Sequence, residues 1–183
     1  RPVTVVGGAN SAGQGAMLFS QYSSKVTMLI RATTIEAGMS QYLVDQIAAT
    51  PNIEVRLNSV VTGLNGEGSL DSLAVHNSET GATEDLEANA MFIFIGAVPH
   101  SELVADVVAR NAAGFIMTGE DLRVDGKTAH GWSLDRDPFM TETNIPGIFA
   151  AGDVQANTVK RVASAVGQGA ISVSFVHQYL GSV

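Results

Sequence analysis

The sequence predicts an α/β fold built around a parallel sheet, and three observations lead to that prediction. Hydrophobic residues make up 45% of the 183 residues, charged residues only 15%, and there are 19 glycines, a composition that suits many tight strand-to-helix turns. A strand, a glycine-rich turn, a helix and a second strand follow one another between Val3 and Arg31. Short alternating segments separated by turn sequences then indicate a small antiparallel meander.

The first element is a buried strand that leads into a helix. Val3–Val6 is a short apolar run with β-branched residues, which favours a central parallel strand. The helix that follows places Ala16 and Phe19 on the side that faces the sheet, and Lys25–Ile30 supplies the second strand. The segment therefore forms one βαβ unit, which is the context that a dinucleotide-binding fingerprint requires.

The turn between this strand and helix carries the fingerprint itself. A helix N-terminus offers free N–H groups and the positive end of the helix dipole to a pyrophosphate. Gly7 suits the tight turn and Ala12 permits close helix–strand packing, while Ala9 replaces the middle glycine and places a methyl group where the ligand approaches. The residues expected to bind the dinucleotide are Gly7, Gly8, Ala9, Asn10, Ser11 and Ala12.

The end of the second strand predicts which nucleotide binds. An NAD site typically has an Asp or Glu here that accepts a hydrogen bond from the ribose 2′-OH, whereas an arginine accommodates a 2′-phosphate. The strand continues into Arg31, and the first carboxylate after it is Glu36. We therefore expect NADP(H), with Arg31 at the 2′-phosphate. A solvated arginine at the strand end is the alternative that the sequence leaves open.

The remaining elements follow from periodicity and turn residues. The apolar spacing in Met39–Ala48 predicts a helix that ends before Pro51, and Ala90–Ile95 predicts a buried strand after the meander. A polar loop is expected at residues 125–138, and its lone histidine, His130, shows no metal-ligand spacing. The short strands predicted between Pro51 and Ala90, which complete a βαβαβ core and add the meander, are Ile53–Leu57, Val60–Leu64, Leu70–Asn77 and Thr83–Leu86; those of the second half are Gly114–Thr118 and Leu122–Val124.

Composition and charge exclude several classes of protein. The net charge of -8 argues against a general surface for nucleic acid or anionic membranes. The absence of cysteine rules out disulfides and thiolate metal sites within these 183 residues. No apolar run approaches the ~20 residues that span a bilayer, and no signal peptide is present, so a cytoplasmic location is expected. Because the sequence enters a strand directly after Arg1-Pro2, we expect it to be part of a longer protein.

A second ligand-binding pattern lies at residues 147–170, which read GIFAAGDVQANTVKRVASAVGQGA. A buried apolar strand is expected to end at Asp153, and a helix is expected to restart at Lys160-Arg161 after a polar loop. A carboxylate at a strand end can accept hydrogen bonds from hydroxyl groups, and a helix start favours an electron-rich or anionic group. The alternative without a ligand makes Asp153 a turn residue and Lys160 and Arg161 solvated charges.

These motifs together resemble the low-molecular-weight thioredoxin reductases and related two-dinucleotide flavoproteins. The segment T-x-x-P-G-I-F-A-A-G-D-V, followed by K-R-V-A-S-A-V-G-Q-G, is similar to the flavin signature of that family. The Gly7 fingerprint, the I-G-x-x-P turn at Ile95–Pro99 and this signature occur in the family's order, so the resemblance covers nearly the whole chain. Further matches to a thioredoxin-reductase-like group, with L-x-R and M-S-x-Y-L segments, are Leu29, Arg31, Met39, Ser40, Tyr42 and Leu43.

The resemblance implies an α/β protein of two domains. A Rossmann-like NAD(P)H-binding domain with an antiparallel meander is expected at residues 1–95, and the C-terminal segment of a second, FAD-binding α/β domain at residues 96–183. No second fingerprint precedes Gly7, so we expect most of the FAD site to lie outside these residues and the chain alone to be inactive. The resemblance also implies a homodimer for the intact protein.

The resemblance further implies cofactors, site residues and a reaction. Asp153 is expected to accept a hydrogen bond from a ribitol hydroxyl of FAD, and the helix start near Arg161 to face the electron-rich pyrimidine edge of the flavin. Hydride would pass from NADPH to FAD, and electrons would pass on to a disulfide of a thioredoxin-like partner. No side chain of this chain is expected to act as a catalytic acid, base or metal ligand. The cofactor-binding residues added by the resemblance are Gly96, Gly152, Asp153, Arg161, Val162 and Ala163.

Two other functions remain open from the sequence. One is a ferredoxin- or flavodoxin-NADP reductase-like flavoenzyme that has no cysteine pair. The other is a non-enzymatic, flavin-binding regulatory protein, which Ala9 and the single arginine Arg31 would suit because both weaken the match to an NADP(H) site. A Cys-x-x-Cys segment upstream of Arg1 would favour disulfide reduction, since only six residues precede Gly7 here.

Overall fold

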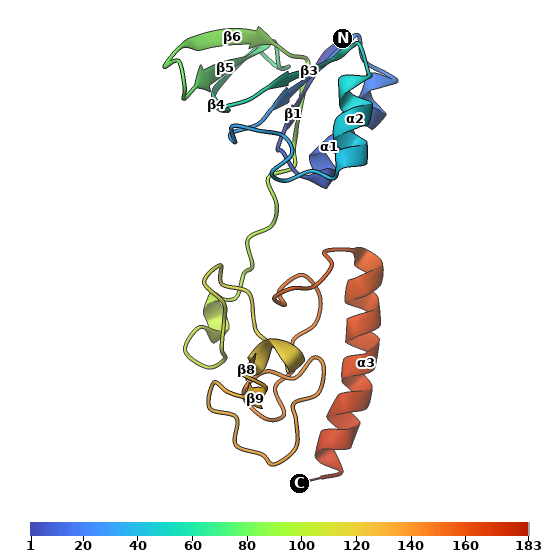
Figure 1. Ribbon diagram of the computed structural model, residues 1–183, viewed down its shortest axis with the longest axis vertical. Coiled ribbons are helices and arrows are strands. Elements are labelled where there is room, and N and C mark those ends of the chain that lie inside the picture. Colours follow the sequence, from blue (N-terminus) through green and yellow to red (C-terminus); the bar gives the residue numbers. More distant parts are fainter. Residues whose placement is uncertain (183) are drawn as a thin grey trace. The chain divides into compact units, whose positions relative to one another are not determined.

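The computed structural model describes residues 1–182, which separate into two compact units, residues 1–96 and 97–182 (Figure 1). The first unit combines a parallel sheet, two α-helices and a three-stranded antiparallel sheet. The second combines a long α-helix with short 3-10 helices and a small hairpin. The prediction of a mixed α/β fold with parallel and antiparallel strands is therefore confirmed.

The parallel sheet of the first unit has the strand order β3-β2-β1-β7. The chain leaves β1 on one side to form β2 and β3, and it returns on the other side of β1 as β7. The strand order therefore reverses between β1 and β7, and ligands of open α/β sheets bind outside the carboxyl ends of the strands at such a point. The elements are β1 (Pro2–Val6), α1 (Asn10–Ser20), β2 (Lys25–Leu29), α2 (Gln41–Ala48), β3 (Ile53–Arg56) and β7 (Ala90–Ile93).

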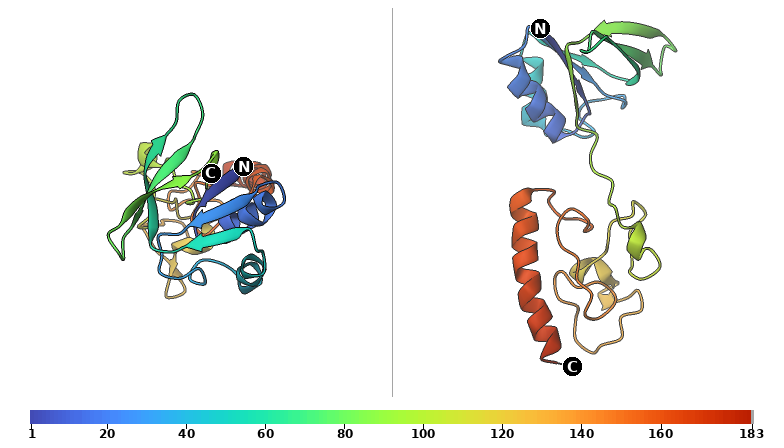
Figure 2. Two further views of the ribbon diagram at one scale, coloured as in Figure 1. Left: turned by 90° about the horizontal axis from the view of Figure 1, so that it is seen from above. Right: turned by 180° about the vertical axis from the view of Figure 1, so that it is seen from behind.

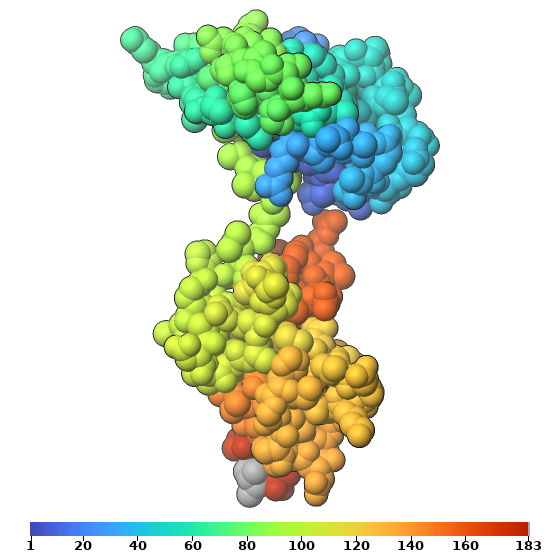
Figure 3. Space-filling model, turned by 60° about the vertical axis from the view of Figure 1, so that its left-hand side comes forward, coloured from blue at the N-terminus to red at the C-terminus, as the bar shows by residue number. Residues whose placement is uncertain are grey.

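The two faces of this sheet are covered by different elements (Figure 2). The antiparallel strands β4 (Ser59–Asn65), β5 (Ser72–Asn77) and β6 (Thr83–Glu87) pack on one face, where Leu29 of β2 meets Leu73 and Leu86. The segment between β2 and α2, residues 31–38, lies at the surface of the unit except for half-buried Ile35 (Figure 3).

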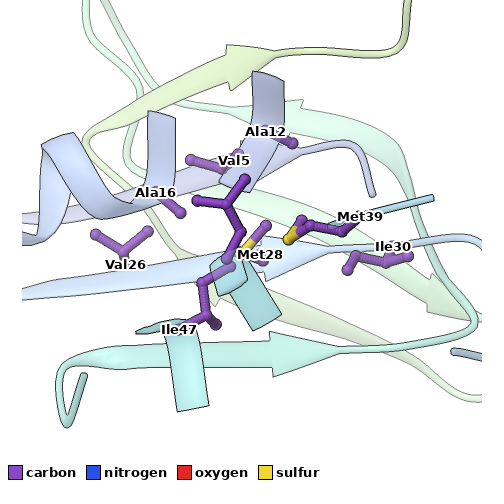
Figure 4. Packing of buried hydrophobic residues seen from close by; sticks show 9 residues of the cluster. Val5, Ala12, Ala16, Val26, Met28, Ile30, Met39 and Ile47 are labelled. Carbon is purple, nitrogen blue, oxygen red and sulfur yellow. The ribbon is translucent and has the colours of Figure 1, made fainter. Parts of the chain in front are cut away.

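Helices α1 and α2 cover the other face of the sheet, and the main hydrophobic core lies beneath them (Figure 4). The small side chains of Ala12 and Ala16 let α1 approach the strands closely, as the amphipathic pattern predicts. The buried members of this cluster are Val5, Ala12, Ala16, Val26, Met28, Ile30, Met39, Leu43 and Ile47.

The second unit is built mainly from irregular segments packed against one long helix. Helix α3 (Val162–Leu180) is held by aromatic stacking of Phe175 on Phe139, with ring centroids 5.0 Å apart, and by a 2.8 Å hydrogen bond between the hydroxyls of Thr141 and Ser172. The other elements are η1 (Glu102–Val104), η2 (Gly119–Leu122), β8 (Arg123–Val124) and β9 (Lys127–Thr128). Within residues 1–182, no helix combines the length and apolar character needed to cross a bilayer.

A buried carboxylate organises the loop that leads towards Asp153. The side chain of Glu142 is 0% exposed and accepts hydrogen bonds from both terminal nitrogens of Arg136, at 2.7 and 2.9 Å. The backbone N–H groups of Phe139 and Gly147 also donate to it, each at 3.0 Å. Burial opposes ionisation of Glu142, but these donors outweigh burial, so the pKa of Glu142 lies below its ordinary value. The carboxylate thus stays charged and fixes both ends of the turn at residues 139–147.

Two strands predicted for the second unit do not form. The prediction of a strand at Gly114–Thr118 is wrong, because Ile116 makes single bridges to Arg110 and Gln155 and the chain turns on both sides of it. The prediction of a strand ending at Asp153 is also wrong, since Phe149 makes one isolated bridge to Glu142. In both places each pairing partner is itself irregular, so the ladder cannot extend beyond one rung.

Other predicted boundaries shift by one or two residues. Helix α2 begins at Gln41 rather than Met39, and Leu122 belongs to η2 rather than to the strand at Arg123–Val124. Strand β7 ends at Ile93 rather than Ile95, because β1 ends at Val6, whose carbonyl accepts the last cross-strand bond. The prediction that this strand is buried is wrong, since Phe92 and Ile93 are exposed. Helix α3 begins at Val162, with Arg161 as its N-cap residue.

Candidate functional site

A cavity of about 690 Å³ lies in the first unit at the carboxyl ends of β1, β2 and β7. This is the place where the strand order reverses, so its position follows from the topology of the sheet. The glycine-rich turn forms one part of its wall, the segment after β2 a second part, and β4 and β7 the rest. Of the predicted site residues, the lining contains Gly7, Gly8, Ala9, Arg31 and Gly96.

The turn at Gly7 is shaped by the backbone on both sides of it. Its N–H donates to the carbonyl of Leu29 at 3.0 Å, which ties the turn to β2. Gly7 has φ +141°, and a Cβ at this position would collide with the carbonyl oxygen of Phe94. Only glycine fits here without strain, as the fingerprint predicts.

The first turn of α1, which follows the cavity-lining residue Ala9, has unpaired backbone donors. The carbonyl of Ala9 accepts hydrogen bonds from the N–H groups of Ala12 and Gly13, at 2.9 and 3.1 Å. The N–H groups of Asn10 and Ser11 lie before these two in the first turn, and among the described residues they have no backbone acceptor. Ala9, the N-cap residue, provides no side-chain cap. An anionic group placed here would receive free N–H donors and the positive end of the helix dipole.

Arg31 gives the cavity its charge. Among residues 1–182, it is the one charged side chain in the lining, and no carboxylate lies within ion-pair distance of it. Glu36, the first carboxylate after β2, is exposed and lies outside the lining. The cavity is therefore cationic at the end of β2, where a 2′-phosphate would lie in a dinucleotide fold.

Three residues of the fingerprint differ in burial and contacts, which the sequence alone did not predict. Ala12 is fully buried and packs α1 against the sheet, so its role is structural. Ser11 is exposed in the first turn of α1. Asn10 is also exposed, but its side-chain oxygen accepts a hydrogen bond from the N–H of Ser40 at 2.8 Å. Gly8 and Ala9 contribute to the cavity wall directly.

The second candidate site lies around Gly152 and Asp153 in the second unit. The N–H of Gly152 donates to the side-chain oxygen of Gln168 on α3 at 2.7 Å, and its carbonyl accepts from Gln155 at 3.1 Å. Gln168 also donates to Thr158 at 2.6 Å. These bonds fix the turn against α3 and leave the carboxylate of Asp153 exposed and, within the described residues, without an ion-pair partner.

The start of α3 resembles the start of α1 in its open donors. Arg161, Val162 and Ala163 are exposed, and Arg161 provides no side-chain cap among the described residues. The N–H of Ala165 donates to the carbonyl of Arg161 at 3.0 Å, which leaves the earlier N–H groups of the helix without intrahelical acceptors. The ammonium group of Lys160 already has partners in the second unit. It donates to the carbonyl of Gln155 at 2.7 Å and lies 4.1 Å from the ring centroid of Phe115.

Asp153 and Arg161 lie outside the cavity found beside η2 in the second unit. A cavity of about 500 Å³ lies beside η2 and residues 155–159, but neither of these two residues lines it. The described residues also contain no group of three or more His, Asp or Glu side chains able to hold a metal ion.

Sequence reasoning missed several residues that shape these sites. Ser59, Val60 and Val61 of β4 line the first cavity, although the sequence suggested only a meander strand. No local signal places β4 there, because its position depends on packing across the sheet. Gln168 carried a usable signal, since it is the one large polar side chain in the run of small and apolar residues VASAVGQGAI that opens the helix.

The chain is similar to proteins of known families over nearly all of its length. The thioredoxin reductase of Schizosaccharomyces pombe is 33% identical over 181 residues, which cover 98% of this chain and 50% of the relative. The 34.2 kDa protein in the rubredoxin operon of Clostridium pasteurianum is 28% identical over 181 residues, covering 99% of this chain and 52% of that protein. The chain thus spans about half the length of the curated relatives that it matches.

Solved structures of two thioredoxin reductases are also similar to this chain. The thioredoxin reductase of Streptococcus pyogenes has a TM-score of 0.63 at 29% identity and matches 100% of this chain and 53% of its own. The thioredoxin reductase of Lactococcus lactis has a TM-score of 0.74, matching 100% of this chain and 54% of its own, and at 24% identity it supports the fold alone.

The model of the pyridine nucleotide-disulphide oxidoreductase family matches residues 1–169, which include the glycine-rich turn, Arg31, the Gly152-Asp153 turn and the start of α3. Since this match spans both units and most of the chain, the protein belongs to the pyridine nucleotide-disulphide oxidoreductase family.

Proposed function

We propose that this chain forms the NADP(H)-binding domain and part of the FAD-binding domain of a thioredoxin-reductase-like flavoprotein. The whole protein would pass hydride from NADPH to FAD and electrons on to a disulfide of a thioredoxin-like partner. Family membership and the thioredoxin reductases among the relatives support this reaction class. A homodimer and a cytoplasmic location are part of the same proposal, although two thioredoxin reductases among the relatives are named as mitochondrial.

The cavity at the carboxyl ends of β1 and β2 is the single observation that carries the proposal. It combines the turn at Gly7, the N-cap residue Ala9 that precedes the open first turn of α1, and one cation, Arg31, with no carboxylate among its described lining residues. The residues present therefore fit NADP(H): N–H donors of Asn10 and Ser11 suit the pyrophosphate, and the guanidinium of Arg31 suits a 2′-phosphate. The cavity volume of about 690 Å³ falls in the ordinary range for cofactor sites.

The residues of the second unit fit the polar part of a flavin. Asp153 would accept a hydrogen bond from a ribitol hydroxyl, and Gln168 would keep the Gly152-Asp153 turn in place. The open N–H groups at Val162 and Ala163, with the dipole of a 19-residue helix behind them, would stabilise negative charge on the ring. FAD supplies the redox chemistry when bound, and the chain's own contribution is to hold and orient it.

Nucleotide binding to the chain tests the proposal for the first unit. Isothermal titration is expected to show NADPH binding roughly 10- to 100-fold more tightly than NADH, because hydrogen bonds to charged groups are worth about 1.5–3 kcal/mol. Arg31→Ala should remove that difference. Arg1→Ala, which makes the same change of charge at an exposed residue outside the cavity, should keep it. Equal binding of the two nucleotides by the native chain would contradict the assignment of NADP(H).

Reduction of the flavin in the whole protein tests the reaction. Stopped-flow mixing with NADPH should bleach the flavin, and added thioredoxin disulfide should restore its colour. Bleaching without reoxidation by thioredoxin would favour a ferredoxin- or flavodoxin-type reductase, which needs no cysteine pair. The absence of bleaching by either nicotinamide nucleotide would leave the non-enzymatic flavin-binding function.

A further inference from the structure

The segment between β2 and α2 forms one wall of the nucleotide cavity without regular secondary structure of its own. We define this wall as residues 32–40, of which Ala32, Thr34, Ala37 and Gly38 line the cavity. Its one internal backbone hydrogen bond among the described residues, from the N–H of Gly38 to the carbonyl of Ile35, is long at 3.4 Å. The wall must therefore be held in place by contacts with other elements.

Such contacts occur at both ends of the wall. At its start, the carbonyl of Ala32 accepts a hydrogen bond from the N–H of Asn58 at 3.1 Å. At its end, the N–H of Ser40 donates to the side-chain oxygen of Asn10 at 2.8 Å. Gly38 also lies directly against the glycine-rich turn, since a Cβ on it would come within 2.8 Å of the carbonyl oxygen of Gly8. Within the wall, Ile35 and the buried Met39 also pack on the main core. Asn10 adds the side-chain hydrogen bond that joins the end of the wall to the first turn of α1.

The hydrogen-bonding chemistry fixes the orientation of the Asn10 carboxamide. A backbone N–H can only donate, so the carboxamide oxygen must be the atom that faces Ser40. Asn10 is also the first residue of α1, and its own N–H is one of the open donors. Asn10 therefore links two parts of the proposed site. Its backbone N–H is one of the donors expected at the pyrophosphate, and its side chain is hydrogen-bonded to the wall that follows Arg31.

We infer that Asn10 is a positioning residue that holds the wall at residues 32–40 against the glycine-rich turn and so preforms the nucleotide cavity. This inference rests on the proposed binding of NADP(H) in the first unit. A preformed wall does not need to be ordered when the nucleotide binds, and that ordering would otherwise weaken binding. Loss of one hydrogen bond of this kind is expected to weaken NADPH binding roughly 2- to 12-fold.

Two variants break the same hydrogen bond from opposite sides. Asn10→Ala removes the acceptor, and Ser40→Pro removes the donor while leaving Asn10 unchanged. Ser40 has φ −64°, which proline adopts, and its side chain makes no cap hydrogen bond, so little else should change. Asn10→Asp keeps an acceptor for the Ser40 N–H and serves as the conservative rescue. Gln14→Ala alters an exposed carboxamide on the same helix outside the cavity and serves as the matched control.

Amide hydrogen exchange and NADPH titration of the 183-residue chain provide the two readouts. We expect faster exchange across residues 33–40 in Asn10→Ala, and native exchange in Asn10→Asp and Gln14→Ala. Asn10→Ala and Ser40→Pro should weaken NADPH binding to a similar extent, and the double variant should bind no more weakly than either single one.

The outcomes separate this inference from the proposed function. Native affinity in Ser40→Pro combined with weak binding in Asn10→Ala would mean that Asn10 contacts the nucleotide directly, and the positioning role would be overturned. Unchanged exchange of residues 33–40 in Asn10→Ala would also overturn it. If the native chain bound neither NADPH nor NADH, the proposed function would fail, while faster exchange in Asn10→Ala would still support the attachment of the wall by Asn10.

Discussion

Replacing Glu142 by glutamine is expected to destabilise the second unit by about 3 kcal/mol. The native carboxylate is 0% exposed and accepts from two nitrogens of Arg136 and from the N–H groups of Phe139 and Gly147. Glutamine keeps one acceptor oxygen, but its NH₂ group must then face N–H donors. At least two bonds to a charged group are lost, each worth about 1.5 kcal/mol at the lower end of the usual range.

The lower end of that range applies because Arg136 is not fully buried. Its side chain is 29% exposed, so water can partly solvate the guanidinium once the carboxylate is gone. Removal of one member of a fully buried pair is usually more costly, about 3–5 kcal/mol. Arg136 also lies 4.2 Å from the ring centroid of Phe139 and 5.3 Å from that of Trp132, and these contacts survive the substitution.

Tryptophan fluorescence can measure the stability of the unit that contains Glu142. Trp132 is the only tryptophan of the chain, and its indole N–H donates to the carbonyl of Arg136 at 2.7 Å. Urea unfolding followed by this signal therefore reports on the second unit. Glu120→Gln makes the same chemical change at a side chain that is 87% exposed and should alter stability by under about 0.5 kcal/mol. A loss in Glu142→Gln no larger than in this control would refute the reasoning.

The remaining predictions concern pH and three single substitutions. Because the folded-state pKa of Glu142 is lowered, its stabilisation is present above the unfolded-state pKa and is lost as the pH falls towards the folded-state value. Urea titrations by Trp132 fluorescence from neutral to acidic pH should therefore show the native chain and Glu142→Gln converging; a constant difference would contradict this. Gly7→Ala should destabilise the first unit by about 3 kcal/mol, since it combines backbone strain with overlap on the Phe94 carbonyl, while the Trp132 transition stays in place; far-ultraviolet circular dichroism measures the first change. Ala9→Gly should strengthen NADPH binding in calorimetry by removing a methyl group from the cavity wall, and weaker binding would argue against a close approach of the pyrophosphate. Asp153→Ala in the whole flavoprotein should weaken FAD binding roughly 10-fold or more, read as flavin absorbance per protein after dialysis, whereas full retention would remove Asp153 from the proposed site.

The first unit could be predicted from the sequence because its signals are local. The glycine-rich turn, the apolar strands and the helix after them follow one another within about thirty residues, as a βαβ unit does. The central strands β1 and β2 are largely buried and therefore read as mostly apolar runs. Even so, the part of the cavity wall formed by Val60 and Val61 was not predictable, because it depends on how the meander packs across the sheet.

The second unit was harder to predict because its contacts join residues far apart in the sequence, and its strands are two residues long or reduced to single bridges. Ile116 pairs with Arg110 and with Gln155, and each partner contributes a single bridge. The burial of Glu142 was invisible in the polar-looking segment MTETN, since it depends on the tertiary position of Arg136 and on two backbone donors. The turn at Gly152-Asp153 could be located from its motif, but the bond that fixes it comes from Gln168, sixteen residues later.

An NMR titration of the ¹⁵N-labelled chain with NADPH tests the central claim most directly. The account predicts saturable shifts of the backbone amides at the start of α1, Asn10 and Ser11, together with those of Arg31 and the wall beside it. The amide of Gly68, at the tip of the turn between β4 and β5, should stay unchanged because it lies outside the cavity. Saturable shifts confined to residues outside the cavity, or no saturable shifts at all, would contradict the claim that the first unit binds NADP(H) at this helix start.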